Sequence, residues 1–335
     1  MSSPGGFSVE WLKLDAARAV DHITTHIRDM VFKDLKRKGL VLGLSGGVDS
    51  SVVAALSARA LGKDRVLALL MPERESSEDS LALGHLVAGE LGIETLIEDI
   101  TPILEATGCY RRRDEMIRTL IPEYGPGYRC KIVLPELSGQ KSYRVFSVVV
   151  QSPDGRQITA RLTPETYHGI VAATNFKQRV RKMMDYYHAD RLHYAVAGTP
   201  NRLEYDQGFF VKNGDGAADL KPIAHLYKTQ VYQLARYLDL PEEILRRQPT
   251  ADTYSLSQSQ EEFYFSLPYE KMDLCIYGMN HGIAAEDVAR AAAISPEQVE
   301  YVYGDITSKR RATRYQHLGP LLVEAVEEIR YRVAQ

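Results

Sequence analysis

The sequence predicts an α/β protein with a parallel β-sheet, and three observations predict it. Short apolar runs alternate with helix-like segments, these segments carry helix-terminal signals, and a glycine-rich loop joins the first run to the helix after it. Continuous apolar runs are typical of parallel strands that are buried on both faces. Strand–helix alternation is in turn typical of a parallel sheet.

The first hundred residues supply most of this alternation. A long helix with apolar residues on one face and a basic last turn comes first, and Gly39 ends it. The third helix begins with serine and acidic residues and is followed by glycine, as capped helices are. The expected strands are residues 40–44, 65–71 and 94–100, and the expected helices are residues 8–38, 50–61 and 76–92.

The alternation stops between residues 109 and 165. Within this segment Pro153-Asp154-Gly155 predicts the turn of a hairpin, with strands near 143–151 and 156–162. The segment contains 10 Lys and Arg against 6 Asp and Glu, and this local excess of positive charge could contact an anionic substrate or a partner. The α/β pattern then resumes with a helix at 175–188, a strand at 193–198, a helix at 227–240 and helical residues over 285–333.

Composition limits the class of protein. The 335 residues and 44% hydrophobic content suit one large domain or two small ones, and the net charge of -3 gives no sign of a nucleic-acid or membrane partner. Three cysteines without a C-x-x-C pair point to a reducing compartment. No apolar run is long enough for a transmembrane helix. A cytoplasmic location is therefore expected.

The stretch "LVLGLSGGVDSS" (40–51) carries the clearest chemical signal. Its glycines allow the backbone to approach an anion at a helix N-terminus. The chain has no G-x-x-x-x-G-K-[ST] sequence, and Asp49 stands where a phosphate loop usually has lysine. A carboxylate beside phosphate is favourable when it holds Mg²⁺. The loop therefore suits a bound pyrophosphate, which would leave while AMP goes to an acceptor.

The family is indicated by these and later motifs. "SGGVDSS" (45–51) resembles the loop of the N-type ATP pyrophosphatases, which include GMP, asparagine and NAD synthetases, and does not choose among them. "NFKQRVRKMMDYY" (175–187), "VAGTPNRLEYDQGFFVKNGDGAADLKPIAHLYKTQVYQLARYL" (196–238) and "QPTAD" (248–252) resemble the ammonia-dependent NAD synthetases. The resemblance covers residues 8–108 and 170–315.

The resemblance implies both a fold and a reaction. The fold is a doubly wound parallel sheet of the adenine nucleotide alpha hydrolase type, in a single domain over residues 1–335 with the insertion at 109–165, usually as a homodimer. The enzyme is a ligase of NAD biosynthesis that uses ATP and Mg²⁺. It adenylates the nicotinate carboxylate of deamido-NAD, and ammonia then displaces AMP to give NAD.

The resemblance also assigns site residues. Asp49 and Lys228 are expected to be catalytic, with Asp49 and Glu204 as Mg²⁺ ligands. Two carboxylates suit Mg²⁺, which takes its other ligands from phosphate and water, and a lysine can meet a phosphate as a point charge. The expected ATP contacts are Gly43, Leu44, Ser45, Gly46, Gly47, Val48, Asp49, Ser50, Thr199, Lys228 and Thr250, and the expected deamido-NAD contacts are Arg179, Lys212, Asp219 and Lys309.

The sequence departs from the family at three places. Ser308 stands where a histidine is expected beside Lys309, the stretch after Asp252 differs from the usual acidic loop, and residues 109–165 are longer than the family's connection. The insertion leaves the sheet after its third strand and returns just before Arg179. We therefore expect it to border the deamido-NAD side of the cavity or the adjoining dimer surface, and not the ATP loop.

Other functions remain open at this point. A related enzyme could amidate a different carboxylate, and this is the main alternative. A tRNA-thiolating enzyme would need a catalytic cysteine pair and a basic RNA surface, and neither is evident. A non-catalytic binding protein is disfavoured by the intact loop and acids. No glutaminase module is recognised, so the ammonia is expected to be free or supplied by a separate glutaminase.

Overall fold

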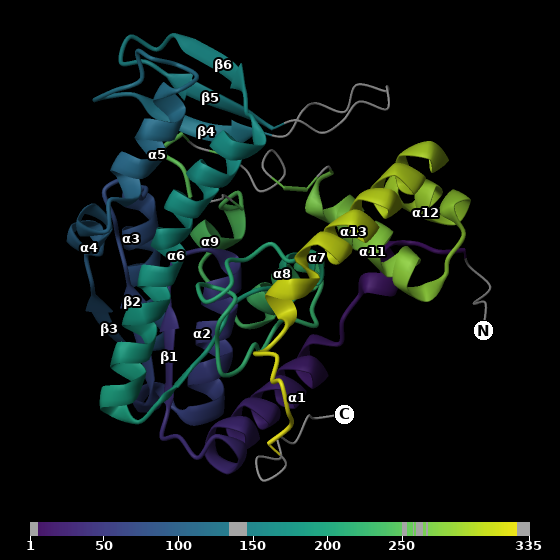
Figure 1. Cartoon of the computed structure of the whole chain (residues 1–335). Helices are drawn as coiled ribbons and strands as arrows, with labels where there is room; N and C mark the ends of the chain where they lie inside the picture. Colours follow the sequence, from purple (N-terminus) through teal and green to yellow (C-terminus); the bar gives the residue numbers. More distant parts are fainter. Residues whose placement is uncertain are drawn as a thin grey trace.

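A four-stranded parallel sheet forms the centre of the molecule, as the sequence predicts (Figure 1). The computed structural model describes residues 6–133, 146–249, 253–256, 258, 264–265 and 267–326. The strand order is β3-β2-β1-β7, with Leu40 of β1 beside Val66 of β2 on one side and Ala195 of β7 on the other. The strands are β1 (Leu40–Gly43), β2 (Val66–Leu70), β3 (Glu94–Ile97) and β7 (Ala195–Val196).

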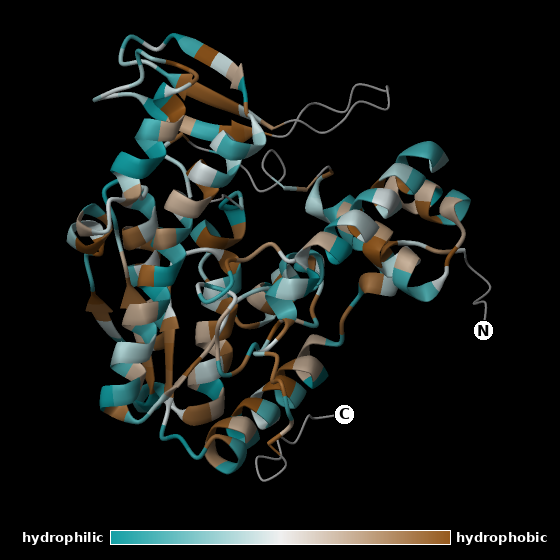
Figure 2. Ribbon diagram, in the orientation of Figure 1, coloured by the Kyte–Doolittle hydropathy of each residue, from teal (hydrophilic) through white to brown (hydrophobic). Residues whose placement is uncertain are grey.

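Helices cover both faces of this sheet, which makes it doubly wound. Alternate strand residues point to opposite faces. Val41, Leu67 and Leu69 pack with residues of α6, whereas Leu40 and Leu42 belong to the core shared with α1, α2 and α8. β1 and β2 are accordingly apolar along their length (Figure 2), whereas the edge strand β3 carries the exposed Glu94. These helices are α1 (Ala16–Asp29), α2 (Val48–Leu61), α3 (Glu78–Leu91), α6 (Pro164–Leu192) and α8 (Lys228–Tyr237).

Two predicted helices have different limits in the structure. The expected helix over 8–38 is divided into a 3₁₀ turn, Val9–Leu12, then α1, then a π-helical turn, Met30–Asp34. Asp15 separates the first two because its side chain caps α1. The helix expected at 175–188 begins eleven residues earlier, where Thr163 caps α6 and Pro164 takes its first position.

The insertion forms a second, antiparallel sheet. After α4 (Thr101–Ala106) and α5 (Cys109–Arg118) come β4 (Arg129–Val133), β5 (Ser147–Gln151) and β6 (Gln157–Arg161), in the order β4-β5-β6. The predicted hairpin is confirmed by β5 and β6, which pair from Gln151–Gln157 onward; residues 143–145 lie outside the described residues. This sheet lies above α5 and the first half of α6 in Figure 1.

The last part of the chain forms a separate helical core around Met272, Cys275, Val288 and Ile306. The prediction of helix over 285–333 is wrong in two described places: Ser295 caps a new helix after a break, and residues 318–326 are not helical. Within the described residues, no helix is both long and apolar enough to cross a membrane. The helices of this part are α7 (Arg202–Gln207), α11 (Tyr269–His281), α12 (Ala285–Ala292) and α13 (Pro296–His317). The short helix α9 (Glu242–Arg246) belongs to the central core instead, where its Ile244 is buried.

Candidate active site

A cavity of about 630 Å³ lies at the carboxyl ends of β1 and β7. Gly43 ends β1, and Gly198 and Thr199 follow β7, and all three line the cavity. The chain leaves β1 toward β2 on one side, while β7 lies on the other side. Ligands of open α/β sheets bind at such a reversal of strand order. The cavity is therefore where the fold itself predicts a site.

The predicted phosphate loop turns into α2 at this end of the sheet. Gly46 has φ +70°, and a Cβ there would lie 2.5 Å from the Leu83 Cβ, so the turn requires glycine. Gly47 is the N-cap of α2, which places the amino end of that helix at the cavity. Seven of the eight predicted loop residues line the cavity, all except Gly46.

Polar contacts hold this loop in place. Ser50 Oγ accepts a hydrogen bond from the Ser45 amide at 3.3 Å and donates to the Gly47 carbonyl at 3.0 Å. Arg247 was missed by sequence reasoning. It donates to the Ser45 carbonyl at 2.9 Å and to Ser80 Oγ at 2.6 Å. The loop is therefore fixed from within and also from α3.

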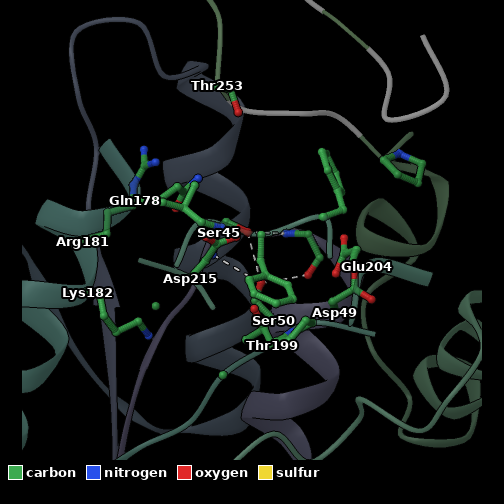
Figure 3. A pocket seen from close by; sticks show the side chains of 18 of the residues that line it. Ser45, Asp49, Ser50, Gln178, Arg181, Lys182, Thr199, Glu204, Asp215 and Thr253 are labelled. Atoms are coloured by element: carbon green, nitrogen blue, oxygen red, sulfur yellow. Dashed lines mark hydrogen bonds between the residues drawn. The ribbon is translucent and has the colours of Figure 1, made fainter. Parts of the chain in front are cut away.

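Asp49 and Glu204 meet on one side of the cavity, as Figure 3 shows. Asn201 connects them: its side-chain amide donates to Asp49 Oδ1 at 3.0 Å, and its backbone amide donates to Glu204 Oε2 at 3.2 Å. Asn201 and Glu204 form the capping box of α7. Sequence reasoning missed Asn201, although the N-x-x-E spacing of "NRLE" is a helix-start signal. Two predicted metal ligands are thus brought together.

Lys228 completes this group from α8. Its Nζ donates to Asp49 Oδ2, and its side chain is only 2% exposed. Burial by itself lowers the pKa of Lys228, but the carboxylates of Asp49 and Glu204 outweigh burial and raise this pKa above its ordinary value. The ammonium therefore stays charged at neutral pH.

Asp273 from α11 holds the start of α8. Its carboxylate accepts hydrogen bonds from the backbone amides of Lys228 at 3.3 Å and Thr229 at 2.7 Å. Burial raises the pKa of Asp273 to about 7, although these amide contacts oppose the increase. No local pattern predicts this cap, because its acceptor comes from a helix more than forty residues later in the chain.

The other predicted residues differ in placement. Thr199, Arg179, Lys212 and Lys309 line the cavity, and Lys212 Nζ also donates to the carbonyls of Tyr315 and Leu318, at 2.8 Å and 3.0 Å. Asp219 is absent from the lining; its carboxylate accepts from the Val196 amide and the Tyr186 hydroxyl. Thr250 lies outside the described residues, and Ser308 is exposed and does not line the cavity.

Several lining residues were missed by sequence reasoning. Lys182 and Asp185 of α6 form an ion pair of 2.8 Å, and Asp215 accepts from the Val211 amide at 2.8 Å. They belong to the same stretches, "NFKQRVRKMMDYY" and "NGDGAAD", that gave Arg179 and Asp219. The helical spacing of Gln178, Arg181, Lys182 and Asp185 could have shown that one face of α6 meets the cavity. Figure 3 shows Gln178, Arg181 and Lys182 opposite Asp49 and Glu204.

The charge of the insertion is placed differently from the expectation. None of its described Lys or Arg side chains lines the cavity. Arg113 is paired with Glu75, and Arg111 is paired with Glu115. The insertion's described contribution to the lining is Phe146, whose ring stacks on Tyr167 with centroids 4.5 Å apart. Among the described residues of the insertion, the part that meets the cavity is therefore aromatic.

Comparisons with known proteins show the family of this chain. The family model described as NAD synthase matches residues 19–119 and 148–316. The NH(3)-dependent NAD(+) synthetase of Rhizobium meliloti (strain 1021) is 59% identical over 323 residues, which are 96% of each chain. Because the alignment covers 96% of both chains, this relative has a similar length, and its sequence also extends across the region of the insertion.

Solved structures support the fold. The NMN synthetase of Francisella tularensis has a TM-score of 0.65 at 22% identity, and covers 92% of this chain and 99% of its own. An NH3-dependent NAD synthetase from Campylobacter jejuni has a TM-score of 0.61 at 23% identity, with coverage of 93% and 100%. At these identities the likeness is one of fold alone.

Proposed function

Because the chain belongs to the NAD synthase family, we propose that it makes NAD from deamido-NAD, ATP and ammonia. It would act as a carbon–nitrogen ligase that adenylates the nicotinate carboxylate and releases pyrophosphate. Ammonia would then displace AMP. The main alternative, a different carboxylate acceptor, is not favoured, because relatives at 57–59% identity carry the name NH(3)-dependent NAD(+) synthetase.

The observation that carries the proposal is the group Asp49, Glu204 and Lys228 at the end of a glycine-rich phosphate loop. The loop presents helix N-terminal amides to an anion. A buried, charged lysine is a fixed positive group for the charge that develops on leaving pyrophosphate. Lys228 is paired with Asp49 in the structure. When ATP is bound, the lysine would contact both Asp49 and a phosphate.

The two carboxylates also fit Mg²⁺. Both line the cavity, and both are oriented by Asn201. No cluster of three or more His, Cys, Asp or Glu suited to a metal occurs in the part of the chain that the structure describes. A pair of carboxylates suits Mg²⁺, which can take only two protein ligands and fill the rest of its coordination shell with phosphate and water. When bound, the ion would neutralise negative charge on the phosphates.

The cavity also suits a second, negatively charged substrate. Three positively charged residues from later parts of the chain line the cavity: Arg179, Lys212 and Lys309. They would supply positive charge for deamido-NAD. Asp219 would act indirectly, by joining α6 to β7. Ammonia would enter free or come from a separate glutaminase. The assembly proposed is a homodimer in the cytoplasm.

The test is product formation by the purified chain. NAD should form only when ATP, Mg²⁺, deamido-NAD and ammonium are all present, with AMP and pyrophosphate released in equal amounts. Chromatography of the nucleotides measures this. Glutamine in place of ammonium should give little product. AMP release that does not depend on deamido-NAD would contradict the proposal and favour another acceptor, with nicotinate mononucleotide as the first to assay.

A further inference from the structure

A buried cluster of charges lies beside the cavity and has no part in the chemistry above. Lys177 of α6 lies 2.8 Å from Glu73 Oε1 and 2.8 Å from Glu75 Oε2, in the loop after β2. Arg113 of α5 reaches Glu75 Oε2 at 2.6 Å, and the Tyr110 hydroxyl donates to Glu73 Oε2 at 2.6 Å. The side chains of Lys177 and Glu73 are each 1% exposed. The cluster is therefore inside the protein and joins α5 and α6 to that loop.

Glu75 of this cluster keeps its charge at neutral pH. Burial by itself raises the pKa of Glu75, but the hydrogen bond from Arg113 and the charge of Lys177 lower it to about 2. A buried pair is costly to break from one side, because the remaining charge is left without a partner. The contacts between α5, α6 and the loop after β2 are thus held in one geometry.

The third hydrogen bond of Lys177 leads to the cavity wall. Its Nζ donates to the backbone carbonyl of Thr253 at 3.0 Å, so all three ammonium protons are used. Thr253 and Tyr254 line the cavity, and Figure 3 shows Thr253 at its rim. One buried lysine therefore connects the loop after β2 to the segment 253–256.

The insertion holds the same segment from its other side. The Cys130 amide in β4 donates to Ser255 Oγ at 2.9 Å, and the Leu256 amide donates to the Cys130 carbonyl at 3.0 Å. Because β4 is an edge strand, these contacts use backbone groups that the sheet leaves open. Tyr254 packs in the insertion's own core, with Ile132 among its neighbours.

The loop after β2, which Lys177 joins to this segment, adjoins the phosphate-loop end of the cavity. The loop after β2 continues into Ser76, Ser77 and Ser80, which all line the cavity. Ser80 receives a hydrogen bond from Arg247, which also holds the Ser45 carbonyl of the phosphate loop. Contacts that fix the loop after β2 therefore act on the end of the cavity assigned to ATP.

We propose that the inserted sheet and the Lys177 cluster position the 253–256 wall for ATP binding, with Lys177 and Ser255 as positioning residues. The inference rests on the proposed function, because that function assigns the phosphate loop to ATP. It changes the expectation from the sequence, which placed the insertion on the deamido-NAD side. The contacts of the described insertion residues lead instead to the loop after β2, through Arg113, and to Ser255 and Leu256, through Cys130.

A pair of variants separates positioning from simple stability. Lys177→Met combined with Glu73→Gln removes the hydrogen bond from Lys177 to the Thr253 carbonyl. It also removes one positive and one negative charge, so the net charge of the cluster is unchanged. Glu73→Gln alone is the matched control, because Lys177 keeps its contacts with Glu75 and Thr253. Ser255→Ala, with Ser255→Thr as its conservative partner, tests the insertion side without altering any buried charge.

The expected result is a selective effect on ATP. In the double variant and in Ser255→Ala, the KM for ATP should rise about tenfold, as expected for loss of a net hydrogen-bond contribution at one site. The KM for deamido-NAD and kcat should stay within about twofold. Calorimetry with a non-hydrolysable ATP analogue should show the same loss. Amide hydrogen exchange should become faster at Leu256, whereas Glu73→Gln and Ser255→Thr should resemble the unmodified chain.

Two results would overturn the inference. One is a lowered melting temperature with both KM values and analogue binding unchanged, since the cluster would then only stabilise the insertion. The other is a rise in the KM for deamido-NAD alone. If the double variant does not fold, the KM for ATP and the analogue binding of Ser255→Ala decide whether the segment has a positioning role. Failure of the unmodified chain to make NAD would contradict the proposed function, and analogue binding would still test the positioning role.

Discussion

At the scale of single residues, the site depends on two carboxylates whose charge matters more than their size. Asp49 meets Lys228 and Asn201, and Glu204 also closes the capping box of α7. We predict that Asp49→Asn and Glu204→Gln each lower kcat by about 10²–10³, as loss of fixed electrostatic stabilisation does. Steady-state NAD formation measures the effect.

The fold should survive these two changes. Gln is an accepted partner in a capping box, so α7 should keep its start in Glu204→Gln. The Asn amide oxygen can still accept the hydrogen bond from Asn201. Circular dichroism and thermal melting are the controls. Near-normal kcat in both variants would exclude the two-carboxylate metal site.

Gly46 and Gly47 offer a matched pair of backbone tests. A Cβ at Gly46 would lie 2.5 Å from Leu83 Cβ at φ +70°, whereas a Cβ at Gly47 would meet only Ser45 Oγ, at 3.4 Å. We predict that Gly46→Ala lowers the free energy of unfolding by about 1–3 kcal/mol, because alanine is strained in the left-handed region. Gly47→Ala should be close to neutral. Urea unfolding measures both, and equal losses would show that the turn is not the cause.

At the scale of elements, α8 is held by a carboxylate from α11. Because the pKa of Asp273 is raised to about 7 by burial, the folded protein keeps this proton to a higher pH than the unfolded chain. The resulting stability is present below the unfolded pKa and is lost as pH rises through about 7. We predict that the free energy of unfolding of the unmodified chain decreases between pH 5 and pH 8. This decrease should be on the order of 2 kcal/mol larger than the decrease in Asp273→Asn.

Urea unfolding at the two pH values checks this difference. Asn retains an oxygen that can cap α8, so the variant should still fold. Asp287→Asn, in the first turn of α12, is the control for removing a carboxylate elsewhere in the chain. Equal pH dependence in Asp273→Asn and the unmodified chain would contradict the prediction.

At the scale of the whole molecule, exposed apolar side chains favour self-association. On α6, Met183 is 52% exposed and Tyr187 is 59% exposed, and they share a helix face with Arg179. We predict that the chain sediments as a homodimer of twice 37.6 kDa. Met183→Glu with Tyr187→Glu should shift it toward monomers, since buried charge is costly at an interface. Lys33→Glu, an exposed change on the π-helical turn Met30–Asp34, is the control, and a monomeric unmodified chain would contradict the prediction.

The sequence by itself determined the parts that depend on neighbouring residues. Apolar runs predicted β1, β2 and β3, the SGG stretch predicted the glycine turn at the start of α2, and the turn at Gly155 predicted the β5–β6 hairpin. These patterns are readable because strand burial, helix capping and turn geometry each involve only a few consecutive residues. The motifs that resemble the NAD synthetases are likewise runs of consecutive residues.

The tertiary structure decided what depends on distant residues. Asp49 and Lys228 lie 179 positions apart, and Lys177 and Thr253 lie 76 apart. A Cβ at Gly169 of α6 would lie 2.6 Å from the Met116 sulfur, so α5 packs closely against α6 at this glycine. Which charges meet is set by how the two sheets and their helices pack, and no local pattern records that packing. For this reason the sequence indicated the phosphate loop and its acids, whereas only the fold brought Lys177, Asp273 and Arg247 to their partners.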